Sequence, residues 1–519
     1  MLTQLLSPAR RAKMRQRAAL EPQRVVLVTP PSVFLLDERV FISLGVLKVA
    51  AVLERAGHAV EHLDLSGIEN YTDVVEAHLG RSSVKVMGIT TTTPQLPAVA
   101  RVVDTVRRCR PDIRVILGGP HVTLVCAAVK LEVKRGVEGR AHRALANLRA
   151  MADVLVAGDG EEAIFEALRP DAPPVVDGDD HKSSLFMDNE AYDATPWPAR
   201  HLVDLASYNY AVDGHRACSL VAQLGCPFGC GFCGGRNSKS LRMIRMRTTE
   251  NIVAEVEHLH RQHGYTGFMW YDDELSVNRA LVELMDALTA LQRRLGVEFR
   301  MRGFVKAELF TAEHAAAMYR AGFRWVLCGF EAADPRILDN INKRATLEDN
   351  TAVVRVAHDA GIKVKALMSV GHPGESEATI HAVRDWLLDV RPDDFDCTCI
   401  TTYPGTPYYD EAAPHETMAD VWTYAAKSGD RLHSFDVDYA RVADYYKGDP
   451  NGGYKSYVFT DHLSPERLVA LRDDVESTVR AKLGIPFNAG AAARRYEHSM
   501  GQSELPPFVL RSSAASPGP

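Results

Sequence analysis

The sequence predicts an α/β protein with two successive sets of parallel strands, first a doubly wound sheet and then a partial (β/α)6 barrel. Short aliphatic and β-branched runs alternate with amphipathic stretches over residues 24–170, and the same alternation returns over residues 216–409. Residues 410–511 lack this rhythm and carry clusters of tyrosine, so we expect a mostly helical C-terminal capping region there.

Each strand is expected at an aliphatic run between amphipathic stretches such as Leu44–Arg55 and Glu250–His263. The first domain has five such runs, at Val25–Thr29, Ala59–Leu63, Val84–Thr90, Ile113–Leu117 and Val154–Ala157. The second has six, at Ser219–Leu224, Phe268–Tyr271, Glu298–Met301, Trp325–Gly329, Lys365–Val370 and Asp396–Thr402. Six βα units do not close an eightfold barrel, and in barrels of this kind chemistry gathers at the C-terminal ends of the strands.

The remaining segments connect or flank these domains. Residues 171–215 are rich in Pro, Asp and Gly, which indicates a linker on the surface. Residues 1–23 are expected to form a disordered or helical arm and residues 512–519 a disordered tail. In the capping region, tyrosine and histidine residues are candidate substrate contacts, among them Tyr496 and His498, with core packing as the alternative.

Composition narrows the class of protein. The 519 residues are 46% hydrophobic and 24% charged, as in an ordinary globular protein, and no apolar run reaches the ~18 residues of a membrane span. The net charge of −7 argues against a partner that is nucleic acid or an anionic membrane. Nine cysteines, an odd number spread over a long chain, do not form a secreted disulfide framework, so a reducing cytoplasm is expected.

Three cysteines are the most informative residues of the chain. Cys226, Cys230 and Cys233 lie within eight positions among glycines, and three such thiolates can ligate three corners of a cubane iron–sulfur cluster. Such clusters normally take four cysteines, and no fourth is near, so one iron is expected to stay open. The alternative, a zinc site, requires a second pair of ligands, and none follows.

This CxxxCxxC spacing, with the aromatic Phe232 before the last cysteine, resembles the signature of the radical S-adenosylmethionine (SAM) superfamily. The resemblance implies a [4Fe-4S] cluster on the three cysteines, with the amino and carboxylate groups of SAM chelating the open iron. Phe232 is then expected to pack against the adenine ring.

Acidic and basic residues at two strand ends are candidate SAM contacts. Asp272 and Asp273 follow the second barrel strand, where carboxylates can accept hydrogen bonds from an ammonium group; the alternative is a helix N-cap. The resemblance assigns this position to the grip on the SAM amino group, and we count both residues as catalytic. Arg302 and Lys306, after the third strand, are candidates for the SAM carboxylate, with solvated surface charge as the alternative.

Three further strand ends resemble elements of the same superfamily. Glu331 ends the fourth strand in a sequence similar to the family's G-x-E-S region, with Ala332 in place of Ser. It is expected to contact ribose or substrate, and we count it as catalytic too. Gly371 and Pro373 belong to a segment similar to the G-x-P-G-E turn that passes the adenine; the alternative is a plain tight turn. Residues 403–407, Tyr-Pro-Gly-Thr-Pro, resemble another recurrent element.

The first domain is expected to bind its ligand beyond the carboxyl ends of its strands. Those ends are small, hydroxyl-bearing or glycine-rich, and suit a large flat ligand pressed against backbone. The candidate residues are Thr90, Thr91, Thr92, Gly118, Gly119, His121, Gly158, Gly160 and Glu161. No GxGxxG follows the first strand and no Walker loop is present, which makes a dinucleotide or nucleotide a weak prediction.

Together with Leu44-Gly45, these strand ends resemble the Rossmann-like cobalamin-binding domain that precedes many radical SAM domains, and the resemblance covers residues 24–410. The DxHxxG motif that supplies an axial histidine to cobalt is absent, since His62, His121 and His181 do not lie in that context. The resemblance therefore implies a lower cobalt face without that histidine. A receiver-like domain without cofactor is the alternative.

The combined resemblance is to cobalamin-dependent radical SAM methyltransferases of class B. It implies that a 5′-deoxyadenosyl radical abstracts hydrogen from an unactivated carbon of a small biosynthetic metabolite and that methylcobalamin delivers the methyl group. A reducing partner such as flavodoxin or ferredoxin is implied too. The alternatives are a rearrangement, cyclisation or oxidation with the same cofactors, and a non-enzymatic iron–sulfur protein. A methylthiotransferase would need a second cluster, but the first domain holds only Cys109 and Cys126.

Overall fold

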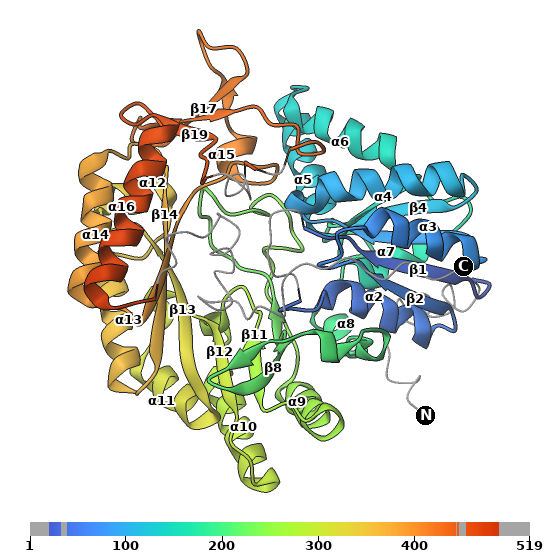
Figure 1. Cartoon of the computed structure of the whole chain (residues 1–519), viewed down its shortest axis with the longest axis horizontal. Coiled ribbons are helices and arrows are strands. Elements are labelled where there is room, and N and C mark those ends of the chain that lie inside the picture. The colour runs from blue at the N-terminus through green and yellow to red at the C-terminus, as the bar shows by residue number, and fades with distance from the viewer. Residues whose placement is uncertain (1–19, 33–38, 443, 446–452, 487–519) are drawn as a thin grey trace. The chain divides into compact units, whose positions relative to one another are not determined.

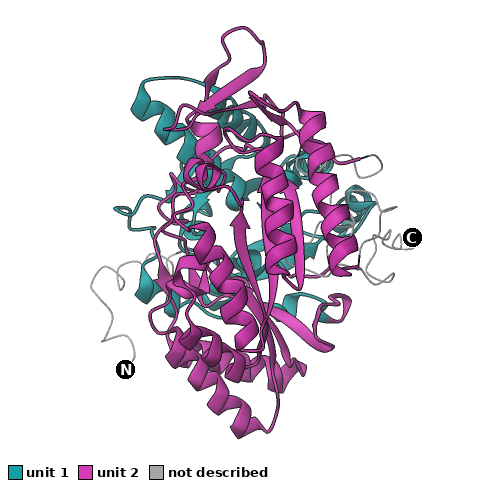
Figure 2. Ribbon diagram, turned by 90° about the vertical axis from the view of Figure 1, so that its left-hand side faces the viewer, with its two compact units in different colours: residues 1–31, 43–205, 512–519 teal, residues 32–42, 206–511 magenta. Residues whose placement is uncertain are grey.

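The computed structural model describes residues 20–32, 39–442, 444–445 and 453–486. The chain divides into two compact units: residues 1–31, 43–205 and 512–519 form unit 1, and residues 32–42 and 206–511 form unit 2 (Figure 2). The predicted C-terminal tail, most of the predicted N-terminal arm and the candidate contacts Tyr496 and His498 lie outside the described residues. The domain boundaries given above stay predictions.

Unit 1 contains the predicted doubly wound sheet (Figure 1). Its six strands are all parallel, in the order β2-β1-β3-β4-β5-β6. They are β1 (Arg24–Thr29), β2 (Ala59–Asp64), β3 (Val86–Thr90), β4 (Arg114–Gly118), β5 (Val154–Gly158) and β6 (Val175–Gly178). All five predicted strands are present, and β6 lies in the stretch expected to be a linker. The strand order reverses between β1 and β3, which is the switch point where ligands bind in this class of sheet.

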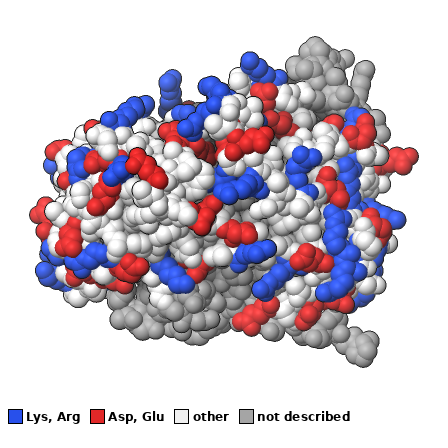
Figure 3. Space-filling model, turned by 90° about the horizontal axis from the view of Figure 1, so that it is seen from above, with Lys and Arg blue, Asp and Glu red and all other residues white. Residues whose placement is uncertain are grey.

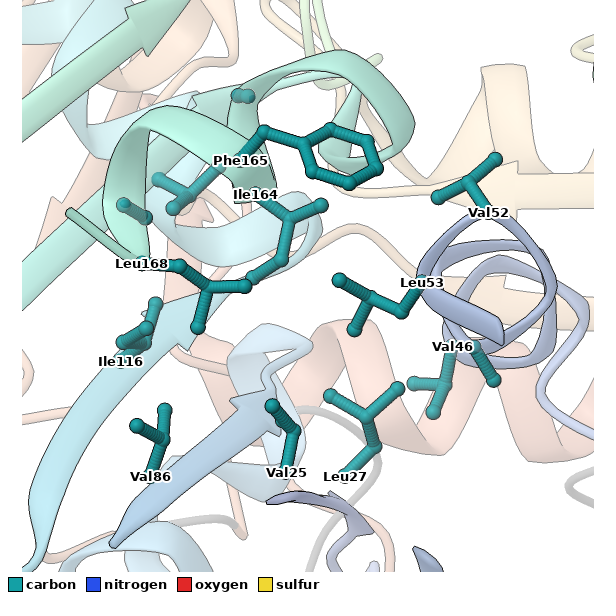
Figure 4. Packing of buried hydrophobic residues seen from close by; sticks show 14 of the residues in the cluster. Val25, Leu27, Val46, Val52, Leu53, Val86, Ile116, Ile164, Phe165 and Leu168 are labelled. Atoms are coloured by element: carbon teal, nitrogen blue, oxygen red, sulfur yellow. The ribbon is translucent and has the colours of Figure 1, made fainter. Parts of the chain in front are cut away.

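Helices cover the sheet of unit 1 and form its core. They are α2 (Leu44–Arg55), α3 (Tyr71–Arg81), α4 (Leu96–Cys109), α5 (Pro120–Arg135), α6 (Arg140–Met151), α7 (Gly160–Ala167) and α8 (Asn189–Asp193). Leu53 of α2 and Ile164 of α7 point toward Val25, Leu27 and Ile116 of the strands (Figure 4). Burying such side chains contributes ~1.5–3 kcal/mol each, which makes this face of the sheet an apolar core of the unit.

Unit 2 contains the predicted partial barrel. Six parallel strands run in the order β15-β14-β13-β12-β11-β8, and the short β7 (Ala211–Val212) pairs antiparallel with β8. The six are β8 (His215–Leu220), β11 (Gly267–Trp270), β12 (Arg300–Phe304), β13 (Phe323–Glu331), β14 (Lys363–Val370) and β15 (Asp394–Cys399). The connecting helices are α9 (Thr249–His263), α10 (Leu281–Leu295), α11 (Ala312–Ala321), α12 (Pro335–Ile341), α13 (Leu347–Asp359) and α14 (Glu377–Val390).

The first barrel strand begins and ends earlier than the sequence predicted. Instead of Ser219–Leu224, β8 spans His215–Leu220. The chain then leaves the sheet because the Asp272 carboxylate accepts hydrogen bonds from the N–H groups of Ala222 and Gln223, at 3.0 and 2.6 Å. Two-residue strands β9 (Gln223–Leu224) and β10 (Arg245–Met246) pair there as a separate antiparallel ribbon.

The structure corrects the expectation of a mostly helical C-terminal region. Its described residues form the long helix α16 (Pro465–Leu483) and also a four-stranded antiparallel sheet. The strands are β16 (Ala413–Pro414), β17 (Val421–Ala425), β18 (Arg431–Phe435) and β19 (Val458–Thr460), preceded by the short α15 (Pro407–Asp410). They are two to five residues long, and none of them is a continuous aliphatic run of the kind that predicted the parallel strands.

Helix α16 covers the free edge of the barrel at β15. Edge strands carry backbone groups without a partner strand, and side chains of α16 bind those groups here. Glu476 accepts a hydrogen bond from the Cys397 N–H at 2.7 Å, Arg472 donates to the Cys397 carbonyl at 2.6 Å, and Arg480 donates to the Phe395 carbonyl. The spacing of four residues places the three side chains on one face of the helix.

The charged residues and the lack of a long apolar run, both noted in the sequence, are reflected in the structure. On the face shown in Figure 3, Lys and Arg side chains are interspersed with Asp and Glu. Within the described residues, no helix is both long enough and apolar enough to cross a membrane.

Candidate active site

The three cysteines lie in a loop between β9 and β10, which we call the cluster loop (residues 225–233). Neighbouring segments hold its backbone. Gly231 donates its N–H to the Ile341 carbonyl at 2.8 Å and accepts from the Tyr408 N–H at 3.0 Å. The Asn342 side-chain amide donates to the Gly229 carbonyl at 2.9 Å. The C-terminal end of α12, with Asn342 after it, and the helix α15 therefore fix the shape of the loop.

Close packing explains the glycines of the loop. A Cβ added at Gly231 would lie 2.2 Å from a ring carbon of Tyr408. Gly225 has φ +89°, and a Cβ there would lie 2.2 Å from the Met243 carbonyl oxygen. Neither position has room for a side chain. The loop backbone can pack this closely against Met243 and Tyr408 only because residues 225 and 231 are glycine.

Arg236 lies beneath the cluster loop and was missed by the sequence analysis. It is buried, and its guanidinium donates to the carbonyls of Cys226, at 3.1 Å, and of Phe228. Burial raises the pKa of the Cys233 thiol to about 12, and the Arg236 charge opposes that shift. A cation beside buried thiols favours thiolates, the form that binds iron. In the sequence, nothing distinguishes this arginine from its neighbours Arg242 and Arg245.

The donor set fits a cubane cluster. All three thiols come from one short loop, the other six cysteines lie elsewhere in the chain, and Arg236 supplies positive charge beneath the loop. Among the described residues, no group of three or more His, Cys, Asp or Glu side chains is arranged to hold a single metal ion. A cubane does not require that arrangement, because each thiolate binds a different iron.

The two aspartates after β11 differ in their surroundings. Asp272 is buried, its carboxylate is bound by the backbone at Ala222 and Gln223, and burial raises its pKa to about 7. Asp273 is exposed beside the cluster loop, where desolvation raises its pKa and the Arg236 charge and the Gly225 N–H oppose that rise. Asp272 thus shapes the backbone that leads into the loop, and Asp273 is the carboxylate open to a ligand.

The two basic candidates at the third barrel strand are also separated, because Arg302 lies within β12 and Lys306 follows it. Lys306 is buried with its Nζ 4.3 Å from the centre of the Phe228 ring in the cluster loop, and it bonds to Glu308 at 2.8 Å. Arg302 lies within β12 itself, with its guanidinium 5.5 Å from the Trp325 ring and hydrogen-bonded to Tyr210. The structure brings Lys306, and not Arg302, to the cluster loop.

Glu331 ends β13 in a strained conformation. Its φ is +67°, in the left-handed region that non-glycine residues seldom occupy, and the pairing of β13 with β14 shifts register there. The carboxylate is buried, with one oxygen 3.1 Å from Lys343 Nζ and the other accepting from the Ser369 hydroxyl at 2.7 Å. Burial by itself lowers the pKa of Lys343, but the neighbouring Glu331 carboxylate outweighs this effect and raises the pKa above its ordinary value.

The turn of residues 371–375 is held in shape by the side chain of its last residue, Glu375. Glu375 is buried and accepts hydrogen bonds from the N–H groups of Gly371 and His372, while burial raises its pKa to about 8. Gly371 has φ +97°, and the Pro373 carbonyl accepts from Asn340 at 2.9 Å. The His372 ring meets Phe232 of the cluster loop edge to face, 5.5 Å between centroids, which brings this turn to the predicted adenine contact.

In unit 1, the predicted cobalamin residues gather at the carboxyl edge of the sheet. Thr90, Gly118 and Gly158 end β3, β4 and β5, and the others begin the segments that follow: Thr91, Thr92, Gly119, His121, Gly160 and Glu161. Thr92 caps a helical turn through Gln95, and Glu161 lies 3.9 Å from Lys48. His121 bonds to Thr93 at 2.9 Å, and burial lowers its pKa to about 4.

The carboxyl edge of this sheet fits a flat ligand. Gly119 has φ +94°, and a Cβ there would lie 2.7 Å from both the Thr90 hydroxyl and the Thr91 N–H. The Thr91 hydroxyl is buried and has no hydrogen-bond partner among the described residues. A tight glycine edge and an unsatisfied hydroxyl lie next to the β1–β3 switch point, where sheets of this class bind their ligands.

Comparison with known families identifies both units. Residues 220–387 match the model of the Radical SAM superfamily, and residues 38–149 match that of the B12 binding domain. The two matches together span more than half of the chain. The chain is a cobalamin-dependent radical SAM enzyme. The expected cofactors, a [4Fe-4S] cluster, SAM and cobalamin, are those of this family.

Several proteins are similar to this cobalamin-dependent radical SAM enzyme. A protein named as an uncharacterized methyltransferase, from Pyrococcus horikoshii, is 24% identical over 77% of this chain and 85% of its own. An anaerobic magnesium-protoporphyrin IX monomethyl ester cyclase from Rubrivivax gelatinosus is 26% identical over 65% of this chain and 60% of its own. The fold is similar to that of TsrM, a radical SAM methyltransferase from Kitasatospora setae solved with cobalamin and the cluster bound. The two structures match with a TM-score of 0.62 and 17% sequence identity, and the match covers 90% of each chain.

Proposed function

We propose that the enzyme transfers a methyl group from SAM, by way of cobalamin, to an unactivated carbon of a small biosynthetic molecule. The presence of both cofactor domains in one chain carries this proposal. The likeness to TsrM over 90% of each chain and to the Pyrococcus protein named as a methyltransferase supports it. A TsrM structure that holds tryptophan as substrate supports a small-molecule substrate.

When bound, the cluster and SAM supply a 5′-deoxyadenosyl radical, and cobalamin carries the methyl group. Cys226, Cys230 and Cys233 are the cluster ligands in this proposal. Phe232, beside His372, packs against adenine.

Three charged residues complete the proposed SAM site. Asp273 accepts from the SAM ammonium, with Asp272 positioning the backbone next to it. Lys306, next to the cluster loop, pairs with the SAM carboxylate. The buried Glu331 is rigidly held and contacts ribose or substrate.

A reducing partner completes the proposal. Reductive cleavage of SAM takes one electron, and a small carrier such as flavodoxin or ferredoxin is the partner that we expect. The proposal places no nucleic acid among the partners, in line with the net charge of −7.

A second candidate keeps both cofactors but transfers no methyl group. The similarity to the magnesium-protoporphyrin ester cyclase favours it, because that protein is named for a ring closure. The residues described above fit either outcome, since both begin with the same radical and differ in where the substrate lies.

Transfer of labelled methyl groups separates the two candidates without a known substrate. Anaerobically reconstituted enzyme would be incubated with deuteriomethyl-SAM and a reductant, and its cobalamin extracted for mass spectrometry. A labelled methyl group on the extracted cobalamin supports methyl transfer. Deoxyadenosine formed from fully loaded enzyme, with no label on cobalamin, would overturn it and favour the second candidate.

Cysteine variants provide the matched controls. Replacing Cys226, Cys230 and Cys233 together by alanine is expected to abolish deoxyadenosine formation. Cys397→Ala removes a buried thiol of β15 and is expected to leave cluster content unchanged.

A further inference from the structure

A chain of hydrogen bonds connects Glu331 with the cluster loop. The Ser369 hydroxyl, on β14, donates to Glu331 at 2.7 Å and lies 2.8 Å from Nε2 of His372. Nδ1 of His372 in turn lies 3.4 Å from the Tyr408 hydroxyl. All four side chains are buried, and they come from three separate segments, β13, the end of β14 with its turn, and α15.

The chemistry of these groups sets one direction for the hydrogen bonds. The Glu331 carboxylate, paired with Lys343, only accepts. The single proton of the Ser369 hydroxyl is therefore donated to Glu331, so its oxygen must accept from Nε2–H of His372. Burial and the nearby charge of Lys343 lower the pKa of His372 to about 3, which keeps the ring neutral. Its Nδ1 is then the acceptor for the Tyr408 O–H.

At its far end, this chain of hydrogen bonds reaches Tyr408, which holds the backbone of the cluster loop. Tyr408 donates its backbone N–H to Gly231 at 3.0 Å, and its ring occupies the space where a Cβ of Gly231 would lie. The His372 ring packs edge to face on Phe232, and edge to face on Tyr408 with 6.1 Å between centroids. The same two aromatic residues thus contact the loop and orient the hydrogen bonds that end on Glu331.

Glu331 requires such support. Its positive φ costs on the order of 1 kcal/mol or more and persists only where surrounding contacts determine it. Lys343 fixes one carboxylate oxygen and Ser369 the other. A ligand that meets this carboxylate therefore finds it already oriented, which reduces the entropy lost on binding.

We propose that Ser369, His372 and Tyr408 are positioning residues that hold the Glu331 carboxylate in one orientation for SAM. They also link the SAM site to the contacts that hold the backbone of the cluster loop. The inference rests on the first of the two contacts proposed for Glu331, that with the ribose of SAM. It does not depend on methyl transfer.

SAM affinity of the holoenzyme tests the proposal. Ser369→Ala, His372→Phe and the double variant would be reconstituted anaerobically with cluster and cobalamin, and SAM binding measured by equilibrium dialysis. We expect each single variant to bind SAM about 10-fold more weakly, and the double variant also about 10-fold, because all three break the same chain. Thr289→Ala, which removes a half-buried hydroxyl bonded within α10, is the matched control and should bind as wild type.

Two further readouts distinguish positioning from general damage. Iron and sulfide content should equal that of wild type in every variant, while the SAM-induced change in the electron paramagnetic resonance spectrum of the reduced cluster should be diminished in Ser369→Ala. Unchanged SAM affinity in Ser369→Ala, or a double variant weakened about 100-fold, would overturn the proposal. If His372→Phe does not fold, the comparison of Ser369→Ala with Thr289→Ala decides alone. Failure of labelled methyl transfer in a wild type that binds SAM would refute only the proposed function.

Discussion

The Glu476 carboxylate on α16 accepts a hydrogen bond from the backbone N–H of Cys397 at 2.7 Å, and so takes the place of a neighbouring strand at the edge of the barrel. The same carboxylate pairs with Arg480 at 2.7 Å and lies 3.7 Å from Arg472. The C-terminal helix thereby ends the open sheet with side chains, where an eightfold barrel would continue with further strands.

Glu476→Ala is expected to destabilise unit 2 by about 3 kcal/mol, because it leaves buried arginines and a buried N–H without their acceptor. The free energy of unfolding would be measured by urea denaturation. Asp473→Ala on the same helix removes a carboxylate that is 55% exposed, and should cost less than about 0.5 kcal/mol. Equal effects of the two substitutions would contradict the role of Glu476 at this edge.

Gly231→Ala is expected to disturb the cluster loop, since the added methyl group would lie 2.2 Å from the Tyr408 ring. Overpacking of this kind costs ~1–3 kcal/mol, and here the strain falls on the segment between two cluster ligands. Iron and sulfide content after anaerobic reconstitution should drop well below that of wild type. Gly80→Ala in α3, where a Cβ meets nothing within 4 Å, is the control and should retain full cluster content. A fully loaded Gly231→Ala enzyme would show that the loop tolerates the contact.

Glu375 is expected to make stability fall as pH rises. Its pKa is about 8 in the folded protein and 4.5 ordinarily, so between these values the folded state holds a proton that the unfolded chain has released. Stability from this group is complete below pH 4.5 and is lost as pH rises through 8, with a slope of at most about 1.4 kcal/mol per pH unit. Glu375→Gln is neutral in both states and should flatten the decline measured by urea denaturation from pH 5 to 8.

The matched control for that experiment is Glu377→Gln. Glu377 is an exposed carboxylate paired with Arg467, and that pair lowers its pKa, so it does not titrate in this range. Its substitution should keep the wild-type slope. Asp272 and Glu274, with pKa values raised to about 7 by burial, leave some decline in every variant. Identical slopes for Glu375→Gln and wild type would refute the shifted pKa.

Gly119→Ala is expected to reduce cobalamin retention. The added methyl group would lie 2.7 Å from the Thr91 N–H, and the φ of +94° is unfavourable for alanine, so the strand end next to the switch point must move. Cobalamin bound after gel filtration would be quantified by absorption, with Gly80→Ala as the control in the same unit. Cluster content should not change, because the cysteines belong to unit 2. Retention equal to wild type would argue against this edge as the cobalamin site.

Local patterns in the sequence predicted most of the fold. Aliphatic runs predicted five strands of the first sheet and six of the barrel, because parallel strands buried on both faces read as continuous hydrophobic segments. The strand β6 was missed because it lies among prolines, aspartates and glycines, and the sheet β16–β19 because none of its strands is a continuous aliphatic run. The end of β8 was misplaced because a carboxylate 50 residues later, Asp272, binds the backbone there.

The sequence by itself indicated the cofactor chemistry through its resemblance to known cofactor domains, because the ligand spacing within Cys226–Cys233 and the glycines at strand ends are local properties of the chain. Only the tertiary structure decided which charged residues reach the site. Asp272 turned inward to the backbone while Asp273 stayed open, and Lys306 rather than Arg302 reached the cluster loop. Arg236 and the chain from Tyr408 to Glu331 likewise depend on segments far apart in sequence. Burial and partnership decide the role of a polar side chain, and both arise only when such segments pack together.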